Sequence, residues 1–355
     1  MFLSIIIPVF NTPTQYFIRC IESVLNTDNN EFEIIIVDDG SKDELSEDYV
    51  KICANYNNIR YYKKFNEGVS IARNYGISLS MGEYIAFVDA DDTVSDIFIK
   101  RAYEISQITK PDFIVGRIEY MPAVETNQYT EEKDLYYDRN NISTIKLAYI
   151  KSLTGNKIPD NIFSILGSPC GRLYKKSCLE NIRFPERISH WEDQIFNRIF
   201  FDNIDSAVIV SDVWYTYYQN DFSAFHSDFD QHYIEKGIPF WNAWNELNKI
   251  EVDKKLKKYY QIRDVRWFFL AVEDGIVYNK CKYKDKVKQI KSLYNIDLFA
   301  NARQELKYKD YHNYLDKIKL CLFKNKFCGF MILLYELKKI YYDLRGMFDD
   351  FKSFN

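Results

Sequence analysis

Three carboxylates lie within four residues at Asp89, Asp91 and Asp92, directly after the apolar run EYIAFV. Adjacent negative charges repel one another unless a positive group holds them. Oxygen ligands of this kind suit a hard divalent cation such as Mg²⁺ or Mn²⁺, whose coordination shell is completed by substrate phosphates. The alternative is an Asp-rich turn in which Asp92 or Thr93 caps a following helix. Capping by one residue and metal binding by another can coexist.

A second polar group, VDDGS at 37–41, also follows an apolar run. It has two carboxylates, a glycine able to adopt a positive φ and a serine able to cap a helix. By itself it could be just a turn. Beside the first group, it supplies acceptors for a nucleobase N–H and for ribose hydroxyls.

The segment NEGVSIARNYG at 66–76 carries Arg73 one turn into a predicted helix. It has neither a lysine-bearing phosphate loop nor a Gly-x-Gly-x-x-Gly fingerprint, so it matches neither of these nucleotide-binding motifs. The planar guanidinium of Arg73 could reach a diphosphate, which its fork of donors fits. A surface ion pair is the alternative.

Hydrophobic periodicity predicts the elements that must position these residues. Short β-branched runs alternate with stretches whose apolar residues lie three and four apart, as in the predicted helix at 14–26. This alternation favours an α/β fold with a mostly parallel, Rossmann-like sheet that helices cover on both faces. The predicted strands span 3–9, 32–39, 59–64, 83–89 and 112–118.

Ligands of such sheets bind beyond the carboxyl ends of the strands. Polar or conformationally special residues follow three of the predicted strands at this position, and we expect them to meet at one edge. They are Pro8, Phe10, Asn11, Asp38, Asp39, Gly40, Ser41, Asp89, Asp91 and Asp92.

The chain changes character beyond residue 120. It is polar up to about 145, and further helices are predicted near 143–153 and at 189–201. From about residue 230 onward, aromatic residues and lysines recur at helical spacing. This predicts a helical C-terminal region.

Composition indicates a soluble globular protein, with 47% hydrophobic and 28% charged residues. The net charge of −4 comes from intermixed acidic and basic residues, which argues against nucleic acid as a partner. The seven cysteines never form Cys-x-x-Cys, so we expect reduced core cysteines in a cytoplasmic protein. We expect no signal peptide, and no run of about 18 apolar residues predicts a membrane span.

Four segments together, SIIIPVFN, IIIVDDGSKD, NEGVSIARNYG and GEYIAFVDADD, resemble the nucleotide-sugar domain of family 2 glycosyltransferases of the GT-A fold. The resemblance is strong over about the first 100 residues and continues more thinly to about 220. It implies a nucleotide-sugar-binding α/β domain at 1–120 and an acceptor-binding part with the catalytic base at 121–230. A mainly helical region would follow at 231–355.

The resemblance implies inverting transfer of a sugar, typically from a UDP-sugar donor, to a hydroxyl of a glycan or lipid-linked acceptor. The setting would be bacterial capsule, exopolysaccharide or other surface-glycan synthesis. For the donor, it implies that Pro8, Phe10 and Asp39 face the nucleobase and ribose. Asp89 would contact the ribose, and Asn66 would help to hold the diphosphate together with Arg73.

The resemblance also implies a divalent cation, Mn²⁺ or Mg²⁺, carried by Asp91 and bound to the donor diphosphate. The role of Asp92 is open. His226 is a further candidate metal or phosphate contact, against an ordinary polar residue. Gln219 stands where the family usually has an arginine, so one expected cation is missing nearby.

Inverting transfer also needs a base on the acceptor side. The motif WEDQ at 191–194 resembles the family's Glu-Asp motif, so Asp193 is assigned as the base and Glu192 as an acceptor contact. A capping box is the alternative for Glu192, with Ser189 as the cap. The helix dipole would keep Asp193 ionised at neutral pH.

The C-terminal stretch FKNKFCGFMILLYELKKIYYDLRGMF combines apolar, aromatic and basic residues. It could lie on the inner face of an anionic plasma membrane, or pack on the catalytic domain or a second subunit of a homodimer. Two other functions stay open. They are a GT-A-fold nucleotidyltransferase, which normally has a Gly-rich basic loop, and a non-catalytic sugar-nucleotide-binding or scaffold subunit.

Overall fold

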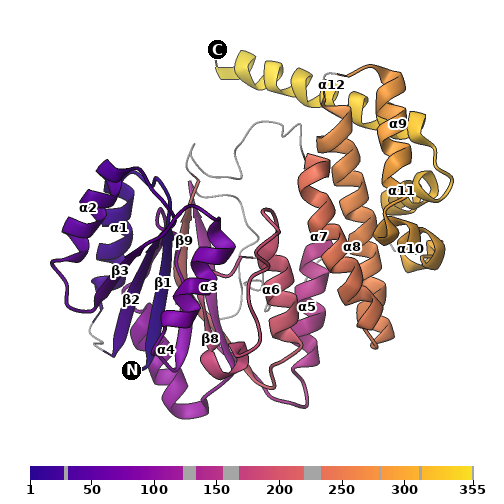
Figure 1. The fold of residues 1–355 in the computed structure, drawn as a ribbon. Helices are drawn as coiled ribbons and strands as arrows, with labels where there is room; N and C mark the ends of the chain where they lie inside the picture. The colour runs from indigo at the N-terminus through magenta and orange to yellow at the C-terminus, as the bar shows by residue number, and fades with distance from the viewer. Residues whose placement is uncertain are drawn as a thin grey trace. The chain divides into compact units, whose positions relative to one another are not determined.

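The computed structural model divides the chain into two compact units, Met1–Ser223 and Ala224–Asn355 (Figure 1). The predicted division at residues 120 and 230 stays a prediction. The structure describes residues 1–27, 31–122, 133–154, 168–219, 233–279, 281–311 and 314–353, and side chains only up to residue 341 in the last range.

The N-terminal unit is built on one sheet, with the strand order β3-β2-β1-β4-β8-β6-β9-β5 and β7 paired to β9 within the described residues. The strands are β1 (Leu3–Val9), β2 (Phe32–Asp38), β3 (Ile59–Lys63), β4 (Tyr84–Phe87), β5 (Thr93–Val94), β6 (Phe113–Met121), β7 (Leu135–Tyr137), β8 (Arg172–Lys175) and β9 (Ala207–Tyr218).

The predicted parallel sheet is confirmed for β3, β2, β1 and β4. Every residue of β2 is buried, and successive side chains point to opposite faces, so protein covers both faces there. Beyond β4 the sheet is mixed, because β8 runs antiparallel between β4 and β6. The strand predicted at 112–118, which is β6, is therefore separated from β4 by β8. An uninterrupted parallel sheet would have placed it next to β4.

Helices flank this sheet, and those predicted at 14–26 and 143–153 are confirmed (Figure 1). A strand, β5, directly follows Asp92, and the next helix begins only at Phe98. The alternative in which Asp92 or Thr93 caps a following helix is therefore wrong, and the role left open for Asp92 is not that of a helix cap. The helices of this unit are α1 (Thr14–Leu25), α2 (Asp43–Cys53), α3 (Val69–Leu79), α4 (Phe98–Thr109), α5 (Ser143–Thr154) and α6 (Glu192–Phe201).

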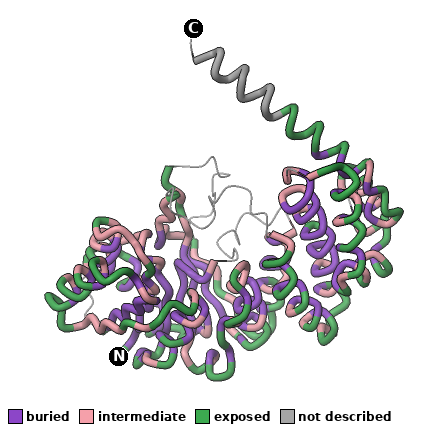
Figure 2. Tube along the Cα trace, turned by 45° about the horizontal axis from the view of Figure 1, so that its top comes forward, coloured by how far each residue is buried: buried purple, intermediate pink, exposed green. Residues whose placement is uncertain are grey.

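The C-terminal unit is helical throughout its described residues, as predicted. Its helices bury an aromatic core that includes Trp241, Trp244 and Trp267. Figure 2 shows buried residues along several of these helices. Among the described helices, none combines the length and apolar character needed to cross a bilayer. The helices are α7 (Tyr233–Ile250), α8 (Lys254–Val272), α9 (Tyr283–Leu293), α10 (Asp297–Glu305), α11 (Tyr314–Lys324) and α12 (Cys328–Ser353).

Candidate active site

The carboxyl ends of β1, β2 and β4 meet at one edge, as predicted. The backbone N–H of Asp39 donates to the carbonyl of Val9. The N–H of Asn11 donates to Oγ of Ser41 at 2.9 Å, which ties the end of β1 to the turn after β2. The end of β4 is joined to the same edge by the hydrogen bond from Val88 N–H to Ile6 O.

Asp39 is buried, and its carboxylate organises the turn that precedes α3. Oδ1 accepts from Nζ of Lys64 at 2.7 Å, and Oδ2 accepts from the backbone N–H of Gly68 at 2.8 Å. Gly40 has φ +82°, and a Cβ there would lie only 2.6 Å from the backbone nitrogen of Asn66. A glycine is needed for both reasons, since the conformation and the close approach exclude a side chain.

Four of the residues assigned to the donor lie together at this edge. Asp39 is near Asn66 through the turn just described, and Asn66 is exposed. Pro8 is half-buried, and the ring of Phe10 is half exposed. An exposed ring beside a polar edge can stack on a base, but its contact with a nucleotide stays a prediction.

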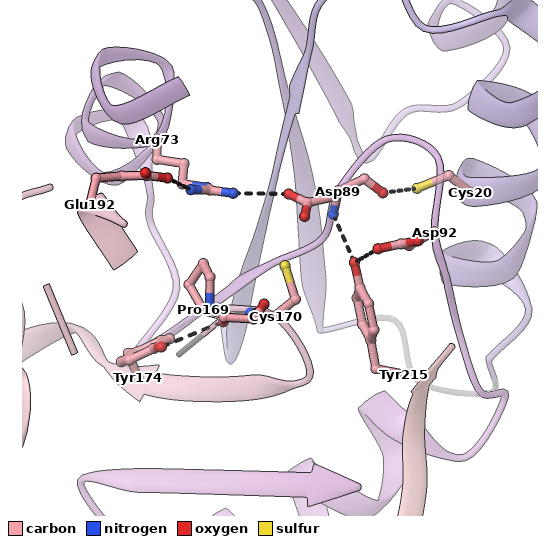
Figure 3. Close-up of polar contacts among 10 residues, drawn as sticks. Cys20, Arg73, Asp89, Asp92, Pro169, Cys170, Tyr174, Glu192 and Tyr215 are labelled. Carbon is pink, nitrogen blue, oxygen red and sulfur yellow. Dashed lines mark hydrogen bonds and ion pairs between the residues drawn. The ribbon is translucent and has the colours of Figure 1, made fainter. Parts of the chain in front are cut away.

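The loop at 88–92 is held from several elements (Figure 3). The guanidinium of Arg19, on α1, donates to the backbone carbonyl of Asp91, and the thiol of Cys20 donates to that of Asp89 at 3.5 Å. From β9, the hydroxyl of Tyr215 accepts the N–H of Asp89 at 3.2 Å. These contacts fix the backbone of the loop while the side chains of Asp89 and Asp91 stay partly exposed.

Asp92 is buried and serves the loop rather than a helix cap. Its carboxylate accepts from the hydroxyl of Tyr215 at 2.6 Å and from the backbone N–H of Tyr218 at 2.8 Å. Burial and the negative charges of Asp89 and Asp91 raise the pKa of Asp92 to about 8, against these hydrogen bonds. Burial is the largest of these effects, so the fold itself disfavours a negative charge on Asp92.

Arg73 joins the donor loop to the start of α6 (Figure 3). It is 5% exposed, and its two terminal nitrogens lie 3.0 Å from Oδ1 of Asp89 and 3.0 Å from Oε1 of Glu192. The surface ion pair considered for Arg73 is thus a buried one. Burial opposes its charge, but the two carboxylates outweigh that effect and raise the pKa of Arg73. Contact with a diphosphate stays a prediction.

The start of α6 does not form the capping box considered for Ser189 and Glu192. The helix begins at Glu192, and the cap is Trp191 in the left-handed region with φ 63°. Ser189 Oγ instead forms a hydrogen bond with Nδ1 of His190 at 3.0 Å. The carboxylate of Glu192 forms its ion pair with Arg73 instead of a hydrogen bond within a capping box.

Asp193 is half-buried beside Glu192, and one of its oxygens accepts the N–H of Gln194 at 2.8 Å. Burial, and next the negative charge of Glu192, raise the pKa of Asp193 to about 7, although Arg73 acts in the opposite direction. Burial thus opposes the ionisation that the helix dipole was expected to favour at neutral pH. The carboxyl group is poised to exchange a proton near pH 7.

Sequence reasoning missed Arg19, Cys20, Tyr215 and Tyr218 around the donor loop. Arg19, Cys20 and Tyr215 belong to no recognised motif. Tyr218 precedes Gln219 at the position of the family's usual Tyr-Arg pair, but no contact with the donor loop was assigned to it. Tyr215 and Tyr218 come from a strand more than 120 residues away. His226 lies outside the described residues, so its suggested role stays a prediction.

The model of glycosyl transferase family 2 matches residues 4–182. An uncharacterized glycosyltransferase of Rickettsia felis is 42% identical over 131 residues, 36% of this chain and 21% of that protein. The minor teichoic acid biosynthesis protein GgaB of Bacillus subtilis is 31% identical over 221 residues, 60% of this chain and 22% of that protein. The aligned parts thus cover only about a fifth of these two relatives.

The fold is similar to that of a solved structure, S. aureus TarS 1–349 in complex with UDP-GlcNAc. The superposition covers 96% of this chain and 92% of that one, with a TM-score of 0.68 and 19% sequence identity. This likeness confirms the predicted GT-A-type α/β fold and extends through the helical region that carries no recognisable motif.

Proposed function

The chain belongs to glycosyl transferase family 2, and from this premise we propose that it is an inverting glycosyltransferase. It moves a sugar, a hexose or a derivative of one, from a nucleotide-diphosphate donor to an acceptor hydroxyl. The buried guanidinium of Arg73 carries the proposal, because it binds Asp89 of the donor loop and Glu192 at once. It brings the donor edge and Asp193, the candidate base, to one site.

The proposed donor is a UDP-sugar. The solved structure with the same fold was determined with UDP-GlcNAc, which supports this nucleotide class. In this chain the buried Asp39 and the exposed ring of Phe10 lie at the same edge of the sheet. A carboxylate can accept a base N–H, and an aromatic ring can stack on the base, so the two provide the contacts that a nucleoside needs.

Transfer forms one bond and breaks another at the anomeric carbon of the donor sugar. The acceptor oxygen attacks that carbon from one face, while the bond to the diphosphate breaks on the other and its electron pair leaves with the nucleoside diphosphate. Asp193 takes the acceptor proton. A pKa of about 7 suits this task, because a general base is most effective when its pKa lies near the working pH.

The donor loop fits a divalent cation, Mn²⁺ or Mg²⁺. The partly exposed Asp91 would hold it, and Asp89 places a second partly exposed carboxylate in the same loop. When bound, the cation would neutralise charge on the leaving diphosphate. Within the described ranges, no three His, Cys, Asp or Glu side chains form a complete metal-binding group. Mg²⁺ sites commonly use one or two protein carboxylates and substrate phosphates.

The proposed acceptor is a hydroxyl of a glycan or of a lipid-linked oligosaccharide in bacterial surface-glycan synthesis. The name of the Bacillus subtilis relative, a teichoic acid biosynthesis protein, supports this setting. Glu192 lies beside the base, but its carboxylate is held by Arg73 at 3.0 Å. We therefore propose that Glu192 orients the start of α6, and that any contact with the acceptor uses its second oxygen.

The experiment incubates the purified chain with a panel of nucleotide sugars and Mn²⁺ or Mg²⁺, with and without a chelator, and follows nucleoside diphosphate release. We expect metal-dependent release from one donor, lost in Asp91→Ala and kept in the matched control Asp96→Ala, which removes an exposed carboxylate just after the loop. Release of pyrophosphate from a nucleoside triphosphate would indicate a nucleotidyltransferase instead. Donor binding without turnover, with acceptor candidates present, would favour a binding or scaffold subunit.

A further inference from the structure

Charge is divided unevenly between the two units. Met1–Ser223 has 33 acidic and 22 basic residues, a net charge of −11. Ala224–Asn355 has 18 acidic and 25 basic residues, a net charge of +7. The intermixed charge inferred from the whole chain is therefore wrong at the level of the units. A charge difference of this size between two halves points to an anionic partner for the basic one.

The first described turns of α12 are apolar on two opposite faces. One face is buried in its own unit through Met331, Ile332 and Tyr335. The other face is exposed (Figure 2), and its side chains recur three and four residues apart, which places them in one stripe along the helix. The exposed side chains are Phe330 (65%), Leu333 (50%), Leu334 (40%), Leu337 (55%) and Ile340 (54%).

Further exposed apolar side chains precede α12, and lysines lie at the two ends of the stripe. Leu315 on α11 is 66% exposed, and Phe327 in the connection is 46% exposed. Residues 314–341 contain six lysines and two acidic residues, a net charge of +4. Lys326 and Lys339 are exposed at the two ends of the stripe. We call the exposed apolar residues of 314–341, with these two lysines, the α11–α12 surface.

We propose that the α11–α12 surface docks on an anionic phospholipid membrane. An amphipathic helix binds such a surface by placing its apolar face at the boundary between headgroups and acyl chains, while lysines bind lipid phosphates. The α11–α12 surface has both an apolar stripe and lysines. Unless another molecule covers the stripe, its large aliphatic side chains are exposed to water.

The charge and the apolar character of the surface favour an anionic membrane over a second copy of the chain and over a nucleic acid. Docking on a second copy would bring together two copies of segment 314–341, each with a net charge of +4, and these would repel one another. A nucleic acid would suit the lysines and could stack on Phe330, but the aliphatic side chains that make up most of the stripe offer it neither hydrogen bonds nor a stacking surface. An anionic bilayer matches both the charge and the apolar stripe.

Docking would deepen the proposed function, on which this part rests, because lipid-linked acceptors would be met at the membrane surface. The test is independent of catalysis. It measures sedimentation of the full chain with vesicles of phosphatidylcholine alone, or of equal parts phosphatidylcholine and phosphatidylglycerol, without donor or acceptor. If the chain did not bind vesicles, the nucleotide-release experiment could still succeed. If the chain released no nucleotide, vesicle binding could still be measured. The two proposals can therefore fail separately.

Two sets of variants separate the apolar and the charged parts. Leu334→Gln with Leu337→Gln removes part of the stripe, and Ile108→Gln is the matched control, an aliphatic side chain 79% exposed on α4. Lys326→Gln with Lys339→Gln removes two charges. A lysine near an anionic bilayer contributes about 1 kcal/mol, which is about fivefold in the partition coefficient, so removing the pair should weaken binding roughly 25-fold.

The proposal expects binding to the anionic vesicles that weakens with salt, falls in both double variants and is unchanged in Ile108→Gln. Equal or absent binding to the two kinds of vesicle would overturn it. So would a concentration-dependent dimer that Leu334→Gln abolishes in place of vesicle binding, which would assign the surface to a second copy. Binding to duplex DNA or RNA that the leucine variants leave intact, without vesicle binding, would assign the basic unit to nucleic acid.

Discussion

The donor loop and the start of α6 each hold a carboxyl group whose pKa is raised, to about 8 at Asp92 and to about 7 at Asp193. Their partners differ. Asp92 is buried and accepts from a tyrosine hydroxyl and a backbone N–H of β9, whereas Asp193 accepts a hydrogen bond from the backbone N–H of Gln194 in its own helix.

A perturbed pKa does not by itself identify a catalytic group. Both shifts have burial as their largest cause, and a neighbouring negative charge as the next. Asp92 is locked into the fold of the loop, and Asp193 is half-buried at the end of a helix where a substrate could reach it. We therefore assign positioning to the first and proton transfer to the second.

Replacing the base should have the largest effect. Asp193→Asn keeps the size of the side chain and removes the basic oxygen, so kcat for transfer should fall about 100- to 10,000-fold, with little change in the donor KM. Steady-state kinetics with a genuine acceptor measures this. Asp202→Asn, at the other end of α6, is the control and should behave like the natural chain. Full activity in Asp193→Asn would show that Asp193 is not the general base.

The second largest effect is expected from removing Arg73, which links the donor loop to the start of α6. Arg73→Met leaves Asp89 and Glu192 without their shared cation, and removing one partner of a buried pair costs about 3 kcal/mol or more in the free energy of unfolding. Urea unfolding measures this. Arg139→Met, which removes a surface ion pair with Asp205, should leave the midpoint unchanged. An equally small change in Arg73→Met would mean that the buried link contributes little.

A smaller effect is expected from the hydroxyl that holds the donor loop. Tyr215→Phe removes a donor to Asp92 and an acceptor for the N–H of Asp89, so kcat/KM for the donor should fall about tenfold, mostly through KM. Tyr84→Phe is the matched control. It removes a buried hydroxyl that donates to Pro111 O from the opposite end of β4. Equal kinetic losses in both variants would show a general loss of stability rather than positioning.

Local pattern was enough to predict most of the strands and the convergence of Asp39, Asp89 and Asp91 at one edge. β-branched runs bury themselves in parallel strands, and the carboxyl ends of such strands necessarily share an edge. The same logic did not anticipate β8, because an antiparallel insertion leaves no signal in the preceding alternation of strands and helices.

Contacts between residues far apart in the sequence account for the other places where the structure differs from the sequence-based expectations. Arg73 reaches Glu192 across 119 positions, and this pair displaced the capping box that the local sequence around Ser189 fits. Asp92 reaches Tyr215 across 123 positions, which turned a predicted helix cap into a buried anchor of the loop. Tertiary pairing overrode a local signal at both places, and both lie in the candidate active site.

The pH dependence of transfer tests the central claim most directly, because the base must be ionised to act. With a pKa of about 7 for Asp193, kcat/KM should be level above about pH 8 and fall about tenfold per unit below pH 7. In Asp193→Asn, the residual transfer should lose this acid limb. The same limb in both proteins, or a natural chain whose activity stays level down to pH 5, would contradict the assignment of Asp193 as the base.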